Sequence, residues 1–541
     1  MKVFRVKDHY ILEVLASRRE DIASLMAYRG LTFSTSASSR EKAVLFTSNP
    51  YAVADIADPA TCPDLAPYRK EIDLSRALDG VGTKRLPPGV ELWDYQRATL
   101  DYLLARNGGI NGDQPGLGKT ITSIAYCNQR EAQRVLVIVP ASVRIQWGEQ
   151  IRRFSTIPNV KVSVMLKVKD GIHPTAHYQV LSYDAARNPA IIKAIAKSQW
   201  DVMICDEAHK MKNIDALTTR AVLGNNRGEY QHGEIKIPAI KNYCREHLAL
   251  TGTLLLNRPA EAYVLLRHFD HEAIDFMGWE AFKNRYNKQA DMKTIEGKRF
   301  KLESTSLESE LQNRLRVNVL ARHEKKDVLK FMRPPRYSIV KCEENGAVKG
   351  ALDVEGMLGL SIDEIQTTKD FEILGHIAEA RRLMGLALAP QIIEYACDFL
   401  DGSEEKLVIF GWHIDVLTAF EEGLVQYGTV RVDGRKSAGA RQKAVDDFIS
   451  LEHKRVFIGN IQSAGTGLDG LQKVCSRCYL AEPDWVPAQN EQAVARLDRI
   501  GQENLVNAEI FVAPGSISEK ILVRALEKLN VIHKVLDQKE Q

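Results

Sequence analysis

Short apolar runs alternate with longer amphipathic stretches from about Leu92 to the end of the chain. The runs are typical of buried strands and the stretches between them of helices, and this alternation is characteristic of parallel sheets with helices on both faces. An α/β fold with two sets of strands is therefore predicted. The first set is Val135–Val139, Tyr178–Ser182, Val202–Cys205 and His247–Leu250; the second is Lys406–Phe410, Val430–Val432, Arg455–Ile458, Cys478–Leu480 and Ala508–Val512.

Two changes of pattern divide the chain further. Residues 1–85 contain an amphipathic piece at Glu20–Tyr28 and a strand-like run at Ala43–Phe46, and a Pro-Pro-Gly stretch follows them. Residues 283–336 look helical and polar, with 15 Lys or Arg against 7 Asp or Glu. Such charges indicate either a solvated connector or a basic wall that faces phosphates. The expected domains are an N-terminal accessory α+β domain (1–85), a first lobe (86–282), a basic helical connector (283–336) and a second lobe (337–541).

Composition narrows the class of protein without choosing its function. The 541 residues are 45% hydrophobic, which is enough for several packed cores. The formal charge of +3 is nearly neutral, so any contact with nucleic acid must come from local patches. No stretch approaches about 20 unbroken apolar residues, and the N-terminus lacks an apolar signal core. We expect a cytoplasmic, monomeric protein without a membrane partner.

Eight cysteines are scattered along the chain. Cys475 and Cys478 have the spacing of a metal site, but a second pair is missing nearby and an apolar strand pattern follows. Reduced thiols packed as small hydrophobic groups are the expectation.

A glycine-rich turn at residues 113–120, Asp-Gln-Pro-Gly-Leu-Gly-Lys-Thr, follows the predicted helix Tyr95–Arg106 and a short polar break at 107–111. Gly116 and Gly118 allow successive backbone N–H groups to point at phosphate oxygens, and the N-terminus of a helix starting near Lys119 favours an anion. In this pattern the lysine neutralises the β and γ phosphates and the Thr120 hydroxyl binds Mg²⁺. Asp113 departs from the generic pattern, which has glycine there, so a chance turn remains the alternative.

A pair of acidic residues, Asp206 and Glu207, ends the predicted strand before Ala208 and His209. Carboxylates at the carboxyl end of a buried strand lie at the rim of an α/β sheet, where ligands usually bind. Asp206 is the candidate magnesium ligand and Glu207 the candidate base for an attacking water. A solvated helix start is the simpler interpretation, and the glycine-rich turn makes it less favoured.

In this order, the motifs resemble those of the Swi/Snf-type ATPases of helicase superfamily two, over about residues 90–520. In this family, unlike in generic phosphate-loop proteins, the position of Asp113 is an aspartate. The continuation of motif III from Asn257 to Tyr263 is similar to that of the HARP-like annealing translocases. The matching stretches are 92–96 (the adenine-reading Gln motif), 140–147 (Ia), 182–184 (Ib), 206–213 (II), 250–253 (III), 322–328 with 334–335 (connector), 432–434 with 441–442 (IV and its neighbour), 463–468 (V) and 492–502 (VI).

The resemblance implies two RecA-like lobes with ATP and Mg²⁺ between them. The nucleotide is then held by Gln96, Gly116, Leu117, Gly118, Lys119, Thr120, Asp206 and Gly467. Arg496 and Arg499 would approach from the second lobe as arginine fingers, which makes hydrolysis depend on lobe closure; salt bridges on a helix are the structural alternative. The candidate nucleic-acid-binding residues are Ser142, Arg144, Thr251, Ser463 and Thr466. Of these, Thr251 is, together with Thr253, better placed to link the DNA and ATP sites.

The expected function is therefore a DNA-stimulated ATPase that translocates on duplex or branched DNA through backbone contacts, with fork remodelling or strand annealing as its role. A strand-separating DNA or RNA helicase is the first alternative. A non-catalytic binding protein is the second, and the presence of Lys119, Asp206, Glu207 and both arginines disfavours it. Three positions depart from the family pattern: Leu254 replaces a proline, Ala495 an aspartate and Asp498 a histidine. The last two lie beside the arginines and put the strength of coupling in question.

Overall fold

The structure is a computed structural model in which the chain forms two compact units. The first consists mainly of residues up to Glu324 and the second mainly of residues from Lys325 to Leu529. The structure describes residues 2–15, 26, 29, 31–34, 38–39, 42–81, 84–225, 227–252, 259–269, 272–274, 277–293, 299–305, 307–330, 332–359, 371–461, 470–484, 487–520 and 522.

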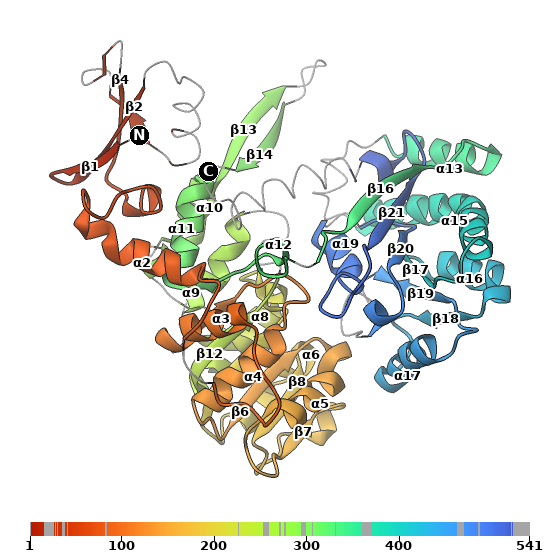
Figure 1. The fold of residues 1–541 in the computed structure, drawn as a ribbon, viewed down its shortest axis with the longest axis horizontal. Coiled ribbons are helices and arrows are strands. Elements are labelled where there is room, and N and C mark those ends of the chain that lie inside the picture. The colour runs from red at the N-terminus through yellow and green to blue at the C-terminus, as the bar shows by residue number, and fades with distance from the viewer. Residues whose placement is uncertain are drawn as a thin grey trace. The chain divides into compact units, whose positions relative to one another are not determined.

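A parallel sheet forms the centre of the first unit, in the strand order β15-β5-β12-β9-β6-β8-β7 (Figure 1). Its strand β6 (Val135–Val139) is a continuous apolar run, as expected for a strand with helices on both faces. The four predicted strands are confirmed, with ends within three residues of those predicted. The strands are β5 (Gly108–Asn111), β6 (Val135–Val139), β7 (Val162–Val164), β8 (Tyr178–Ser182), β9 (Trp200–Asp206), β12 (Cys244–Leu250) and β15 (Leu320–Ala321).

The side chains of this sheet pack into two cores, one on each face. On one face, Val137 and Ile204 meet side chains such as Leu103, Ile124 and Ile151, which come from three helices. On the other, sheet residues such as Ile138 pack against the remaining helices. The first three helices are α3 (Asp94–Ala105), α4 (Lys119–Gln129) and α5 (Arg144–Phe154); those on the second face include α6 (Tyr183–Ala186), α7 (Pro189–Ile195), α8 (Leu217–Val222), α9 (Tyr263–Phe269), α10 (Trp279–Tyr286) and α11 (Glu308–Asn318).

The strand β5 corrects the sequence prediction, which assigned residues 107–111 to a polar break. Its four residues, Gly-Gly-Ile-Asn, are all buried and lie between β12 and β15. Gly108 and Gly109 have φ values of 132° and 129°, and a Cβ on Gly108 would clash with the carbonyl oxygen of His247. Close packing against the neighbouring strand therefore requires glycine here, and two glycines remove the apolar pattern by which strands are recognised.

The second unit has its own parallel sheet, in the order β16-β21-β20-β17-β19-β18 (Figure 1). The five predicted strands are confirmed, whereas the edge strand β16 was not predicted. Two cores again lie on the two faces. The strands are β16 (Arg336–Lys341), β17 (Leu407–Gly411), β18 (Thr429–Val432), β19 (Val456–Asn460), β20 (Arg477–Leu480) and β21 (Asn507–Val512); α13 (Gly346–Met357), α15 (Phe371–Asp401) and α16 (Ile414–Gly423) cover one face, and α17 (Ala438–Ser450) and α19 (Pro487–Val494) cover the other.

Helix α15 is, by length and composition, long and apolar enough to cross a membrane over Glu372–Asp401. Its Leu388 and Ile392 are buried in a core of the second unit. Its Arg381 is also buried, and the guanidinium donates to the carbonyl oxygen of Pro483 at 2.8 Å. These contacts are those of a core helix of this lobe.

The N-terminal part of the chain forms a small antiparallel sheet in the order β1-β2-β4-β3, followed by α2 (Ala66–Ser75). The predicted strand Ala43–Phe46 is confirmed within β4, while most of the predicted amphipathic piece Glu20–Tyr28 lies outside the described residues. Together with the two lobes, this sheet confirms the predicted fold class. The strands are β1 (Lys2–Val6), β2 (His9–Leu15), β3 (Thr32–Phe33) and β4 (Lys42–Thr47).

Helix α11 joins this N-terminal part to the first lobe. The helix is polar in sequence, yet eight of its eleven residues are buried. The Asn313 side-chain amide donates to the Tyr51 carbonyl oxygen at 2.8 Å and to the Asp55 carboxylate at 2.7 Å. After the helix, the Leu320 carbonyl accepts a hydrogen bond from the Ser75 hydroxyl at 2.5 Å. Buried polar groups need such partners, so α11 depends on residues from the N-terminal part.

The same helix α11 also carries a buried ion-pair cluster. Glu310 accepts hydrogen bonds from Arg285 at 2.9 and 2.6 Å, from Arg314 at 2.9 Å and from the Tyr286 hydroxyl at 2.8 Å. Burial alone would raise the pKa of Glu310, but the two guanidinium groups lower it overall. The cluster fixes α10 against α11.

The sequence predicted a helical connector at residues 283–336, but only part of this stretch is helical. It contains the end of α10, the antiparallel hairpin of β13 (Asn287–Lys293) and β14 (Arg299–Thr305), α11, strand β15 and the short α12 (Lys325–Val328). Each hairpin strand has only two apolar residues among many charged and polar ones, and this short alternation was overlooked within the charged stretch.

Candidate active site

Three neighbouring strands of the first lobe end at the same level. Asn111 at the end of β5 pairs with Leu250 of β12, and Leu250 pairs with Asp206 at the end of β9. The glycine-rich turn follows β5, motif III follows β12, and motif II begins at Asp206. Because adjacent strands are about 4.8 Å apart, all three motifs start within about 10 Å of one another. The geometry thus gathers motifs that are far apart in the sequence.

The glycine-rich turn leads directly into α4. Gly116 and Gly118 have φ values of 90° and 79°, and α4 begins at Lys119 with Gly118 as its N-cap. A Cβ on Gly118 would clash with the side-chain amide of Gln96. The first-turn N–H groups of an eleven-residue helix are thus directed at the turn, as an anion site requires.

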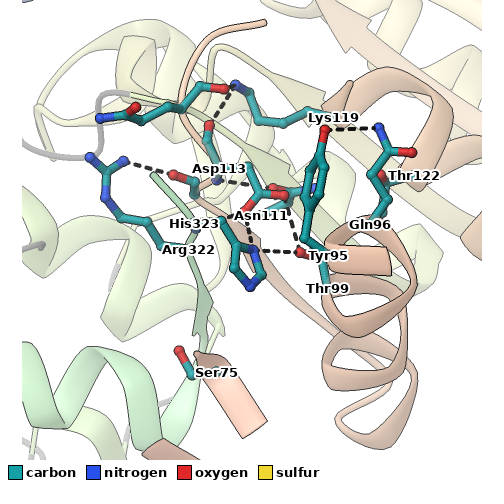
Figure 2. A network of polar contacts seen from close by, with 12 residues as sticks. Ser75, Tyr95, Gln96, Thr99, Asn111, Asp113, Lys119, Thr122, Arg322 and His323 are labelled. Atoms are coloured by element: carbon teal, nitrogen blue, oxygen red, sulfur yellow. Dashed lines mark hydrogen bonds and ion pairs between the residues drawn. The ribbon is translucent and has the colours of Figure 1, made fainter. Parts of the chain in front are cut away.

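Lys119 extends back over the turn that precedes it. Its ammonium donates to the carbonyl oxygens of Asp113 at 2.7 Å and Gln114 at 3.3 Å (Figure 2). Burial lowers the pKa of this ammonium, although three nearby carboxylates oppose the shift. Neutral carbonyl oxygens are weaker partners than phosphate oxygens, so the ammonium can transfer to an anion that enters the turn.

Asp206 is held by three bonds at the end of β9. Its carboxylate accepts from the Trp147 indole at 2.8 Å and from the Glu207 backbone N–H at 2.9 Å, and its carbonyl accepts from the Tyr183 hydroxyl at 2.7 Å. Burial first, and then the charge of Glu207, raise the pKa of Asp206 to about 6. Burial and mutual repulsion make two adjacent ionised carboxylates unfavourable, and a hard divalent cation would relieve both effects.

Glu207 has a left-handed backbone, with φ of 51°. Its carboxylate lies 3.2 Å from Nδ1 of His209, and the same nitrogen lies 3.2 Å from the Thr251 hydroxyl. Thr251 is fully buried, and its hydroxyl contacts His209 of motif II. A left-handed non-glycine residue at a rim of this kind is typical of functional sites.

Behind the turn, Asp113 takes part in a polar network that the sequence did not reveal (Figure 2). Its buried carboxylate accepts from the Thr99 hydroxyl at 3.1 Å, and from the backbone N–H of His323 at 2.9 Å. The His323 imidazole Nδ1 lies 2.8 Å from the same carboxylate. Arg322 donates to the carbonyl oxygens of Gly112 at 2.7 Å and Gly252 at 2.9 Å. Only the family's aspartate at this position pointed towards these contacts.

Gln96 is buried and caps its own helix. Its side-chain oxygen accepts from the Trp93 backbone N–H at 3.0 Å. The amide group lies beside Gly118, as the clash described above shows. Its predicted role at adenine remains a prediction.

The predicted nucleic-acid residues occupy different settings. Ser142 lies in the short helical turn Ala141–Val143 and is half-buried. The Arg144 guanidinium already donates to three carbonyl oxygens, those of Ala141, Met165 and Leu166, at 2.6 to 3.1 Å. A phosphate bound there would have to share or replace these bonds. Thr253, Leu254, Ser463, Thr466 and Gly467 lie outside the described residues.

Arg496 and Arg499 follow α19 in the second unit, and both are half-buried. Between them, the Asp498 carboxylate forms an ion pair with Lys325 at 2.6 Å. Lys325 is largely buried and also donates to the Asp498 carbonyl oxygen. The aspartate that replaces a family histidine therefore has a cationic partner in the connector.

The cysteine pair does not form a metal site with other described residues. Cys475 and Cys478 are free and buried, and the Cys475 thiol lies 3.1 Å from the Lys406 carbonyl oxygen. Among the described residues, no group of three or more His, Cys, Asp or Glu side chains could hold a metal. The thiols pack in the core of the second lobe, as expected.

Comparison with known families agrees with this geometry. The family model of the SNF2-related domain matches residues 93–349. The chain carries an SNF2-related domain. The predicted kinship with Swi/Snf-type proteins is therefore confirmed, and the domain covers the glycine-rich turn and motifs Ia to III.

Three curated relatives extend the likeness beyond the SNF2-related domain. The chain is 27% identical over 440 residues to the DNA annealing helicase and endonuclease ZRANB3 of Homo sapiens, covering 79% of this chain and 39% of that protein. It is 26% identical over 473 residues to the SWI/SNF-related matrix-associated actin-dependent regulator of chromatin subfamily A-like protein 1 of Xenopus tropicalis (85% and 46%). It is 26% identical over 471 residues to an uncharacterized ATP-dependent helicase of Mycoplasma pneumoniae (82% and 42%). The chain thus spans less than half the length of these relatives.

Proposed function

We propose that this protein is an ATP-dependent, sequence-independent translocase on duplex or branched DNA, with fork remodelling or strand annealing as its role. The observation that carries the proposal is the common level at which β5, β12 and β9 end. It brings the anion-binding turn, the half-buried acidic pair and motif III to one rim of the sheet. The relatives named as an annealing helicase and an ATP-dependent helicase support the same assignment.

In this proposal the first lobe binds ATP through the turn at Gly116–Thr120. Lys119 exchanges its two carbonyl partners for the β and γ phosphates, and Asp206 and the Thr120 hydroxyl hold Mg²⁺. A bound Mg²⁺ neutralises charge that develops on the phosphates. Glu207 accepts a proton from the attacking water, and His209 and Thr251 fix the orientation of its carboxylate.

The second lobe completes the site in the proposal. Arg496 and Arg499 supply positive charge to the γ-phosphate only when the lobes close, and an arginine finger is worth about 10³- to 10⁵-fold in rate. DNA that binds across both lobes selects the closed state and thereby stimulates hydrolysis. Ser142, Arg144, Ser463 and Thr466 are the proposed phosphate contacts. Backbone contacts of this kind are independent of sequence and sensitive to salt.

Steady-state ATP hydrolysis tests the proposal when it is measured with duplex, forked, four-way and single-stranded DNA and with RNA. The expected result is strong stimulation by duplex or branched DNA that falls as salt increases. A preference for RNA, or strand separation of a simple duplex, would favour the alternative of a strand-separating helicase. Glu207→Gln is the matched control, because it retains the fold and the nucleotide contacts of Lys119. Localisation in the cytoplasm of a bacterial or viral system belongs to the same proposal.

A further inference from the structure

The strand that leads out of the first unit is hydrogen-bonded to the residues before the phosphate-binding turn. The Gly112 N–H donates to the Ala321 carbonyl at 2.7 Å, and the Gln114 N–H donates to the His323 carbonyl at 3.1 Å. In return, the His323 N–H donates to the Asp113 carboxylate. The chain passes into the second unit immediately afterwards, at Lys325. Residues 321–323, which lead towards the second unit, and the base of the turn therefore form one hydrogen-bonded ribbon.

The imidazole of His323 lies between two hydrogen-bond acceptors. Its Nδ1 is 2.8 Å from an Asp113 carboxylate oxygen, and its Nε2 is 2.8 Å from the carbonyl oxygen of Ala77. The Ala77 carbonyl can only accept, so Nε2 donates to it and Nδ1 is the ring nitrogen that pairs with the Asp113 carboxyl group. His323 and Asp113 are both buried, and this contact lies inside the lobe.

The carboxyl group of Asp113 depends on this imidazole. Its other partners are the Thr99 hydroxyl and the His323 backbone N–H, both of which are neutral donors. The carbonyl oxygen of the same residue holds the Lys119 ammonium. A side chain at position 323 that cannot pair with Asp113 would leave a buried polar group with fewer partners, directly beneath the lysine that is to bind phosphate.

We propose that His323 is a positioning residue for nucleotide binding that fixes Asp113 and the phosphate-binding turn to the strand leading towards the second unit. The inference rests on the proposed ATP-binding function and deepens it. It also gives a physical reason for aspartate at position 113, since glycine could not reach this imidazole. His323 touches neither the nucleotide nor the water that attacks it, and it acts through Asp113.

A double-mutant cycle with a fluorescent ATP analogue tests this role. His323→Gln should weaken binding of the analogue about tenfold or more, because the contact between Nδ1 and Asp113 is lost and a buried carboxyl group remains. His323→Gln combined with Asp113→Asn removes both members of the pair and should recover most of the lost affinity. His247→Gln is the matched control: this histidine lies in the same sheet, and its ring bonds to the Lys241 carbonyl rather than to the turn. The His247→Gln variant should bind the analogue with the affinity of the unmodified protein.

The hydrolysis kinetics provide a second readout. The KM for ATP should rise in His323→Gln while kcat at saturating ATP stays within about threefold, because the chemical groups remain in place. Unchanged affinity in His323→Gln, or a double variant that binds no better than it, would overturn the inference. If His323→Gln does not fold, the double variant decides: it must fold and bind, and its failure would equally overturn the inference. If the unmodified protein binds no analogue, the proposed function itself is wrong.

Discussion

Substitution of Trp147 by phenylalanine should specifically weaken magnesium-dependent nucleotide binding. The Trp147 indole donates to the Asp206 carboxylate at 2.8 Å, and phenylalanine keeps the aromatic packing without this donor. A hydrogen bond to a charged group contributes about 1.5–3 kcal/mol, which corresponds to about one to two units of pKa. The pKa of Asp206 is already raised to about 6, so loss of the hydrogen bond from Trp147 favours the protonated acid at neutral pH. Loss of a partner that orients a metal ligand typically weakens metal binding about 10- to 100-fold, and protonation of Asp206 acts in the same direction, so Mg²⁺ should bind at least about tenfold more weakly.

The assay compares the affinity of a fluorescent ATP analogue with excess Mg²⁺ and with EDTA. Trp147→Phe should lose the gain in affinity that Mg²⁺ provides and should bind the analogue normally in EDTA. The matched control is Trp200→Phe, because Trp200 is fully buried in the same lobe and its indole donates to the Ile195 carbonyl at 3.1 Å, away from Asp206. An equal Mg²⁺ effect in Trp147→Phe and the unmodified protein, or an equal loss in both variants, would refute the reasoning.

Three further predictions concern single side chains. Glu207→Gln should retain nucleotide binding and lower ATP turnover to background; steady-state turnover close to that of the unmodified protein would show that Glu207 is not the base. Gly118→Ala should weaken nucleotide binding, because its φ of 79° strains an alanine and the added Cβ clashes with Gln96; affinity equal to that of the unmodified protein would contradict this. Glu310→Gln should lower the free energy of unfolding by about 3–5 kcal/mol, because two arginines lose their buried anion. Since the pKa of Glu310 is lowered in the fold, the same stabilisation should be present at neutral pH and disappear as the pH falls through that pKa, which urea titrations at several pH values measure.

The sequence was sufficient to predict elements whose side chains form a clear pattern of apolar positions. Strands such as Val135–Val139 are continuous apolar runs, and Asp206 follows one of them directly. The sequence failed at β5, where close packing requires glycines that carry no pattern. The two α/β lobes were therefore predictable, while the complete order of strands was not.

Residues that orient the site without touching a ligand could not be predicted from the sequence either. His323 lies 210 positions from Asp113, and its role appears only once β15 is placed beside β5. Trp147 was noticed only as part of motif Ia, and nothing in its neighbourhood pointed to a carboxylate 59 positions away. Residues that touch ligands belong to short recognisable motifs. Residues that orient them are chosen by the fold and carry no local signal.

The buried polar helix α11 changes how the role of the N-terminal residues can be studied. A shortened protein that starts after residue 85 would lack Tyr51, Asp55 and Ser75. The side-chain amide of Asn313 would then lose both of its acceptors. Such a shortened protein should expose one side of α11 to water and loosen β15, which adjoins the phosphate-binding turn through β5. Loss of activity after truncation would then report a damaged lobe rather than a missing recognition module. Point changes on the outer face of the N-terminal sheet are the cleaner way to ask what that sheet recognises.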